Sequence, residues 1–219
     1  MKNKKWLYFI LMLLPLAVSL IALPFLPSQI PAHYGADNQV TRWGSKYEAL
    51  LLPLLTILFG LFMMLMARYA AKQEKSGGSN EKAVVITGLC SLLLFNLMNF
   101  YFLYTDFHQV ENLSEVPVDL FSLVFLCLGI FLILCGALMP RLKNNSIIGL
   151  RTRWSRKNDI TWEKSQKFGG VTFIISGFCM IAASLLTNGT ACFLWSMAIL
   201  LADTVISVWY TYRIAKKYS

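Results

Sequence analysis

The chain has 219 residues, of which 57% are hydrophobic and only 14% are charged. Because a soluble domain carries about 25% charged residues, this composition excludes an ordinary soluble protein. The formal net charge of +9 comes from short segments between apolar runs. That pattern is typical of membrane orientation and attraction to anionic lipids, so direct nucleic-acid binding is not expected.

Six apolar runs dominate the sequence, and few charges interrupt them. Each run has about 20 residues, the length of a helix that crosses a hydrocarbon core of about 30 Å. A helix satisfies its own backbone hydrogen bonds, which lipid cannot do. We therefore predict an all-α polytopic membrane protein with six transmembrane helices. The first run lacks a small-residue cleavage site and precedes five similar runs, so we expect a retained span. The predicted spans are residues 6–26, 47–67, 83–105, 118–139, 168–187 and 191–212.

The cations divide sharply between the loops. All but two of the 20 Lys and Arg residues lie in the N-terminal segment, the second and fourth loops, and the C-terminal segment. The exceptions, Arg42 and Lys46, share the first loop, and the third loop carries only acidic charges. The positive-inside rule then predicts that both termini are cytoplasmic, as an even number of spans requires. We further expect an N-terminal two-span unit at residues 1–82 and a four-span unit at residues 83–219.

The first loop, residues 26–46, is predicted to be an ordered outer loop. Its prolines prevent a continuous helix, and Gly35, Asn38 and Gly44 tolerate the positive φ of compact turns. Ordering at this position indicates a binding site or a packed lid. The candidate binding residues are Pro31, His33, Tyr34, Trp43, Gly44, Ser45 and Lys46.

The fourth loop, residues 140–167, is predicted to be a folded basic loop on the cytoplasmic side. Asn158 or Asp159 is expected to cap a helix that runs through Trp162 into the fifth span. Trp154 and Trp162 are expected to lie against the inner membrane interface, with Arg151 and Arg153 beside lipid phosphates or carboxylates. Such a loop would either brace its spans or present a docking surface to a cytoplasmic partner. Its motif residues are Asn145, Gly149, Arg151, Thr152, Trp154, Asn158 and Trp162.

These two loops carry a family resemblance. The first resembles a motif of a widespread bacterial membrane domain of unknown function. The second is similar to a motif of the SdpI family, membrane immunity proteins against an SDP-type peptide toxin. The order of the motifs and the six-span layout also match, so the resemblance covers most of the chain. The first motif is met by Pro27, Ile30, Pro31, His33, Tyr34, Gly44, Ser45 and Lys46, and the second by Asn145, Gly149, Leu150, Arg151, Thr152, Trp154, Ser155, Asn158 and Trp162.

The resemblance has departures. The family usually has Gly and Asp where this chain has Asn38 and Thr41, Pro where it has Arg153, and His where it has Gln166. Since neither Thr41 nor Gln166 titrates, a proton-linked or metal-linked role is not expected at either position.

What the resemblance implies is self-protection against a secreted membrane-active peptide. The implied partners are the peptide toxin, membrane lipids and a cytoplasmic transcriptional repressor that is held at the membrane for signalling. The implied location is the bacterial cytoplasmic membrane. A small-solute or ion transporter or channel, and a structural membrane protein without a ligand, stay open as alternatives.

Asp203 lies near the middle of the sixth span. A carboxylate there costs about 2.5–3.5 kcal/mol on insertion scales, and Asn96 and Asn99 of the third span are its expected partners. One hypothesis is a polar cluster that binds a ligand or a proton. The other is a protonated Asp203 whose hydrogen bonds hold helices together.

Catalytic chemistry is not indicated. His33 and His108 are the two histidines of the chain, and both are predicted to lie outside the membrane. No nucleophile–base motif or zinc-binding spacing accompanies them. The sequence therefore predicts no enzyme, no metal site and no cofactor, and the five cysteines are expected to pack as small apolar residues.

Overall fold

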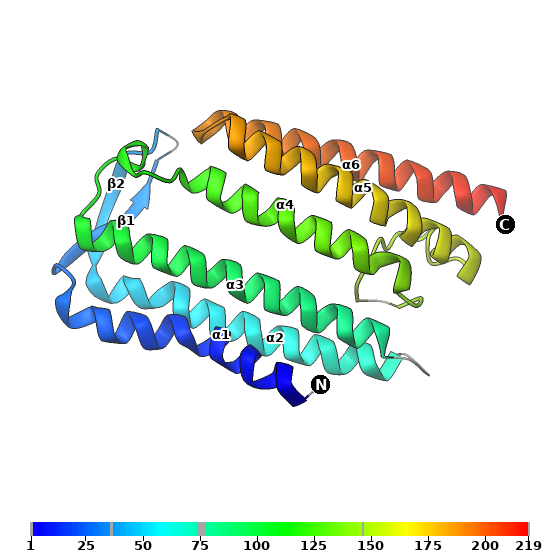
Figure 1. Ribbon diagram of the computed structural model, residues 1–219, viewed down its shortest axis with the longest axis horizontal. Helices are drawn as coiled ribbons and strands as arrows, with labels where there is room; N and C mark the ends of the chain where they lie inside the picture. Colours follow the sequence, from blue (N-terminus) through cyan, green and yellow to red (C-terminus); the bar gives the residue numbers. More distant parts are fainter. Residues whose placement is uncertain (1, 36, 74–77, 146, 219) are drawn as a thin grey trace. The chain divides into compact units, whose positions relative to one another are not determined.

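The computed structural model describes residues 2–35, 37–73, 78–145 and 147–218. Within them, six helices are long and apolar enough to cross a membrane, which confirms the predicted fold class of a multi-pass membrane protein. The sidedness of the termini stays a prediction. The helices are α1 (Lys2–Ala22), α2 (Leu51–Gln73), α3 (Ser79–His108), α4 (Leu120–Leu138), α5 (Asp159–Leu186) and α6 (Gly189–Lys217), as Figure 1 shows.

The chain packs into two compact units. Unit 1 contains Met1–Phe62 and Gly88–Leu120, and unit 2 contains Met63–Thr87 and Phe121–Ser219. The predicted division into residues 1–82 and 83–219 stays a prediction.

Unit 1 includes an antiparallel hairpin of β1 (Gln29–Tyr34) and β2 (Val40–Ser45). The loop that the sequence predicts to be ordered is therefore a two-stranded sheet. The 3-10 turns η1 (Leu23–Phe25) and η2 (Lys46–Leu50) connect it to α1 and α2. The register shifts around His33, so the strand is irregular at that residue.

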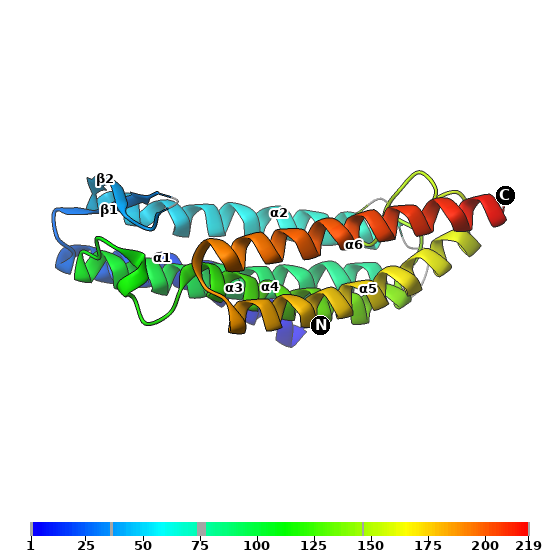
Figure 2. The ribbon, with the colours of Figure 1, turned by 90° about the horizontal axis from the view of Figure 1, so that it is seen from above.

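Unit 2 contains the α5–α6 hairpin, whose helices lie side by side in the two views of Figures 1 and 2. Only Thr187 and Asn188 join the two helices. α5 begins at Asp159, well before the predicted span at residue 168, because the Asn158 side chain caps its first turn by accepting a hydrogen bond from Thr161 N at 2.8 Å.

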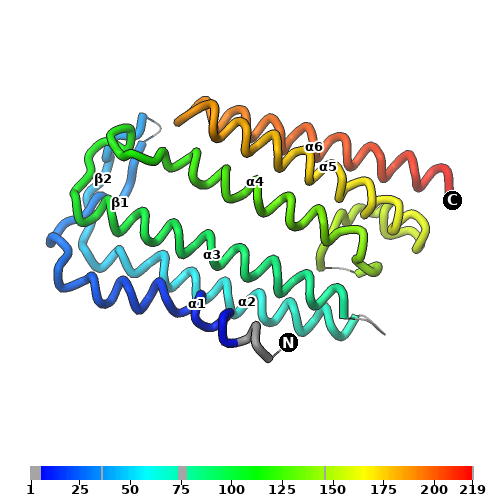
Figure 3. The backbone as a smooth tube through the Cα atoms, viewed as in Figure 1, coloured from blue at the N-terminus to red at the C-terminus, as the bar shows by residue number. Residues whose placement is uncertain are grey.

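Glycines set the contact between α4 and α5, whose backbones Figure 3 traces. A Cβ atom on Gly129 would lie 2.8 Å from the carbonyl oxygen of Gly177, and one on Gly136 would lie 2.6 Å from that of Gly170. Only hydrogen in place of Cβ permits two backbones to approach so closely, as is common where membrane helices pack.

Candidate functional site

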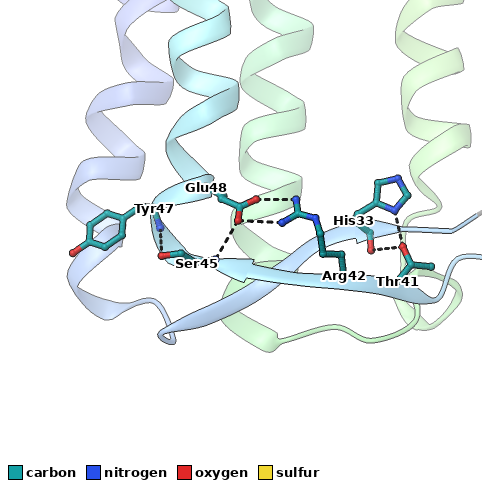
Figure 4. A network of polar contacts seen from close by, with 6 residues as sticks. All are labelled: His33, Thr41, Arg42, Ser45, Tyr47 and Glu48. Carbon is teal, nitrogen blue, oxygen red and sulfur yellow. Dashed lines mark hydrogen bonds and ion pairs between the residues drawn. The ribbon is translucent and has the colours of Figure 1, made fainter.

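A polar network joins the end of β2 to η2, the 3-10 turn that precedes α2 (Figure 4). Arg42 donates to both carboxylate oxygens of Glu48, at 3.1 and 2.8 Å. The backbone N–H of Ser45 donates to Glu48 Oε1 at 3.3 Å, and the Ser45 hydroxyl accepts from Tyr47 N at 3.5 Å. The Glu48 hydrogen bonds also raise the pKa of the Arg42 guanidinium. Ser45 and Glu48 thus form a capping box that fixes where the strand ends.

His33 contacts Thr41 across the hairpin (Figure 4). Its Nδ1 lies 2.6 Å from Thr41 Oγ1, and the Thr41 hydroxyl donates to the His33 carbonyl at 3.3 Å. Thr41, one of the departures from the family pattern, therefore orients the histidine. Among the described residues, no group of three or more His, Cys, Asp or Glu could hold a metal ion.

The connection between α3 and α4 also holds the hairpin. The half-buried Tyr34 donates its hydroxyl to Val110 O at 2.8 Å, and burial raises the pKa of this phenol. The Val40 N–H donates to Glu111 O at 2.9 Å. These bonds span distant parts of the sequence, so this connection and the hairpin form one structured surface.

A cavity of about 400 Å³, which we call the hairpin cavity, lies between the hairpin, the beginning of α2 and the end of α3. Asn99 and Asp106 line it, although they are only 3% and 4% exposed. Asn99 was expected to be a partner of Asp203, and no role was predicted for Asp106. The signal that could have found them is their spacing, which puts both on one face of α3. The other lining residues include Ile30, Leu52, Phe102, Leu103 and Leu113.

The candidate binding residues of the first loop divide between two places. Pro31, His33 and Tyr34 line the hairpin cavity together with Arg42 and Glu48. Of the others, Trp43 is 39% exposed, whereas Gly44, Ser45 and Lys46 belong to the junction of β2 with η2.

Asp203 and Asn96 each have a hydrogen-bond partner within their own unit. Asp203 accepts a hydrogen bond from the Ser176 hydroxyl at 3.2 Å, because α5 and α6 are adjacent antiparallel helices. Asn96 donates to the carbonyl oxygens of Leu11 and Leu92, both at 2.7 Å. The expected partnership of Asp203 with the two asparagines stays a prediction.

Asn99 has a different partner within unit 1. Its Oδ1 accepts from the Ser19 hydroxyl at 3.3 Å, which joins α3 to α1. Its Nδ2 is buried and has no hydrogen-bond partner among the described residues. The carbonyl oxygen of the Asn99 amide thus joins α3 to α1, whereas its NH₂ group makes no hydrogen bond among the described residues.

The fourth loop is folded over residues 142–158, the basic loop, except that residue 146 lies outside the described residues. Trp162 is only 3% exposed and donates its indole N–H to Leu142 O at 2.8 Å. The prediction that Trp162 lies against the lipid interface is therefore wrong. One face of the first turns of α5, which includes Thr161, Trp162 and Ser165, is buried within the protein.

Gln166 anchors the basic loop to α5. Its Oε1 accepts from Leu150 N and its Nε2 donates to Leu150 O, both at 3.0 Å. Gly149 adopts φ +98°, and a Cβ atom there would collide with Gln166 Oε1. The motif glycine is thus required both by its backbone conformation and by this amide.

Asn145 and Asn158 organise the two ends of the basic loop. Asn145 Oδ1 accepts from the N–H groups of Ile147 and Ile148, at 2.7 and 2.8 Å, so it closes a turn. The Nδ2 of Asn158 donates to Tyr218 O at 3.1 Å, in addition to the helix cap. Of the two residues predicted to cap this helix, Asn158 and Asp159, Asn158 is the cap.

Thr152 and Ser155 connect the middle of the basic loop to α6. Thr152 N donates to Ser155 Oγ at 2.9 Å, and the Thr152 hydroxyl donates to Thr211 Oγ1 at 3.0 Å. Ser155, which is fully buried, donates to Leu150 O at 2.8 Å. These short polar contacts make the loop part of unit 2.

Aromatic and cationic side chains cover the basic loop. Trp154 packs edge-on against Tyr212 with ring centroids 5.5 Å apart, and the guanidinium of Arg153 lies 5.0 Å from the Trp154 ring centre. Arg151 and Arg156 are exposed. The loop therefore presents positive charge from a fixed backbone.

Comparison with known proteins places both loops in matched segments. Residues 10–57 match the family model "Domain of unknown function (DUF1648)", and residues 141–211 match that of the SdpI/YfhL protein family. The chain is 26% identical to immunity protein SdpI of Bacillus subtilis (strain 168) over 216 residues, which are 98% of this chain and 97% of that relative. No solved structure matches. The resemblance to the SdpI family is thereby confirmed.

Proposed function

We propose that this chain is a membrane immunity protein that protects its own cell against a secreted membrane-active peptide. The observation that carries the proposal is the similarity to an immunity protein along almost the whole chain. The two family segments include the hairpin and the basic loop, and hydrogen bonds hold both of them in place. The proposal assigns no catalytic role to any residue.

The hairpin is the proposed contact surface for the peptide. It combines a cavity lined by Pro31, His33 and Tyr34 with the exposed ring of Trp43. Aromatic side chains at a membrane surface favour amphipathic partners. A peptide held here would be kept from inserting into the bilayer.

The basic loop is the proposed contact surface for a cytoplasmic repressor, which would add signalling to protection. Arg151, Arg153 and Arg156 are exposed on a segment whose backbone is fixed by Gln166 and Asn158. A rigid cationic surface loses little entropy when an acidic partner binds. The same surface also attracts anionic lipid headgroups.

The test is survival of a sensitive Gram-positive host that expresses this chain and is challenged with an SDP-type peptide. We expect the parent to protect, and Trp43→Ala to protect less at equal abundance in the membrane. Trp195→Ala is the matched control, since Trp195 is an exposed tryptophan of α6. Failure of the parent to protect, with the protein present in the membrane, would contradict the proposal. The alternative of a solute transporter would then be tested by measuring solute flux.

The signalling role is tested separately with Arg151→Ala in a host that carries a reporter for the repressor. We expect this variant to keep protection and lose the reporter response. If Arg151→Ala instead lowers the abundance of the protein, the basic loop serves to brace the helices.

A further inference from the structure

The hairpin cavity contains an acidic group that the fold leaves without an ion partner. Asp106 lies in the last turns of α3, lines the cavity and is 4% exposed. The ion pairs found among the described residues are Arg42–Glu48 and Lys167–Glu163, and neither includes Asp106. A buried carboxylate without a cation is costly, so Asp106 is suited to a positively charged ligand.

A second polar group in the same cavity is an unused hydrogen-bond donor. Asn99 is 3% exposed, and its Oδ1 already accepts from Ser19. Its Nδ2 has no partner among the described residues. Since leaving a buried donor unpaired costs free energy, this amide is suited to a ligand that supplies an acceptor.

The spacing of these two groups limits the ligand. Asn99 and Asp106 are two turns apart on one face of α3, which corresponds to about 10 Å along the helix axis. An extended peptide covers that distance in about three residues. The walls between them include Leu52, Phe102 and Leu103, so the ligand must be apolar between its cation and its acceptor.

We propose that the hairpin cavity binds the amino-terminal end of an apolar peptide. The terminal ammonium donates to the Asp106 carboxylate, a backbone carbonyl about three residues on accepts from Asn99 Nδ2, and the side chains between pack on the apolar walls. The cavity volume of about 400 Å³ lies in the range of ligand pockets. This inference rests on the proposed function and names the part of the peptide that the site recognises.

The experiment uses the full chain in nanodiscs that lack ethanolamine lipids, titrated calorimetrically with tri-leucine amide and with its N-acetylated form. We expect saturable binding of the free amine and binding at least about tenfold weaker after acetylation, because acetylation removes a charge-assisted hydrogen bond. Equal affinity for the two peptides, or binding of neither, would overturn the proposal. The comparison changes the ligand alone, so it does not depend on a variant that folds.

A matched pair of variants locates the acidic group. Asp106→Asn should weaken binding of the free amine about as much as acetylation does. Glu115 is an exposed acidic residue of the connection that follows α3, so Glu115→Gln should leave binding unchanged. Unchanged binding by a normally folded Asp106→Asn would contradict the proposal. Loss of peptide binding in nanodiscs rich in phosphatidylethanolamine would also contradict the proposal, because the ammonium group of the lipid would then be the occupant of the cavity.

These outcomes are separable from those of the survival test. A chain that protects cells but binds both tri-leucine peptides equally retains the proposed function and loses this inference. A chain that binds the free amine through Asp106 without protecting cells retains the peptide site and loses the immunity function.

Discussion

The side-chain amide of Gln166 makes hydrogen bonds to both the backbone N–H and the backbone C=O of Leu150. The two hydrogen bonds are 3.0 Å long, and Gln166 is fully buried. Leu150 follows Gly149, whose positive φ turns the chain toward α5. This pair therefore fixes the basic loop to the first turns of α5, and an imidazole at position 166 could not make both bonds in the same way.

Gln166→Leu should destabilise unit 2 strongly. The change replaces the amide by an apolar side chain, which leaves the N–H of Leu150 without its partner and removes one of the two donors to its C=O, at a cost of about 2 kcal/mol. The measurement is the melting temperature of purified protein in detergent, followed by tryptophan fluorescence. Lys167→Gln is the neighbouring control, because its bond to Glu163 is exposed and contributes little. A Gln166→Leu protein that melts like the parent would contradict the anchoring role.

Gly136→Ala should push α4 and α5 apart, because the new methyl group would meet the backbone of Gly170 at 2.6 Å. Backbone cannot move aside as a side chain can, so we expect a loss of about 2 kcal/mol and a lower melting temperature. Gly60→Ala is the control, since its methyl group would meet the Met12 side chain at 2.7 Å. Methionine adapts its rotamers easily. Equal losses for the two variants would contradict the close approach of the backbones.

The helices could be predicted from sequence because lipid imposes one solution on a long apolar run. The start of α5 could not be predicted from hydropathy, which places the apolar span at residue 168. It was predicted from Asn158, whose side chain caps the helix that begins at Asp159. The buried contacts of Trp162 and Gln166, which hydropathy does not show, hold this polar first part of the helix against the basic loop.

The candidate site was predicted only in part. The order of the first loop followed from its prolines and glycines, but the pairing of β1 with β2 did not, since Pro31 lies within a strand and apolar residues do not alternate there. The hairpin cavity depends on contacts between residues far apart in sequence, such as Tyr34 and Val110. Asp203 was paired with the asparagines on chemical grounds, whereas the α5–α6 hairpin brings Ser176 to it.

The two roles of Glu48 should separate by substitution. Glu48→Gln keeps an acceptor for Ser45 N and loses the ion pair with Arg42, whereas Glu48→Ala loses both. We expect a small fall in melting temperature for the first variant and a larger one for the second. About 1 M NaCl should shrink the difference between the parent and Glu48→Gln, because salt screens exposed pairs. Identical melting temperatures for the two variants would show that the capping bond contributes nothing.

Asp203→Asn should leave both stability and protection unchanged. The Asn side chain keeps a carbonyl oxygen that can accept from the Ser176 hydroxyl, which the structure places 3.2 Å from Asp203 Oδ1. Asp203→Leu removes that acceptor from the middle of α6 and should cost about 1 kcal/mol. Ser176→Ala, which removes the donor, is the matched control and should lower the melting temperature by a similar amount.

The measurement for Asp203 combines the melting temperature in detergent with survival under peptide challenge. If Asp203→Asn protects like the parent, the hydrogen bond between α5 and α6 is what this position requires, and ionisation plays no part. If the variant is stable and abundant but fails to protect, a titrating or charged carboxylate is needed inside the membrane. That second outcome would support the hypothesis of a ligand- or proton-binding group, since Asn preserves both the shape and the acceptor.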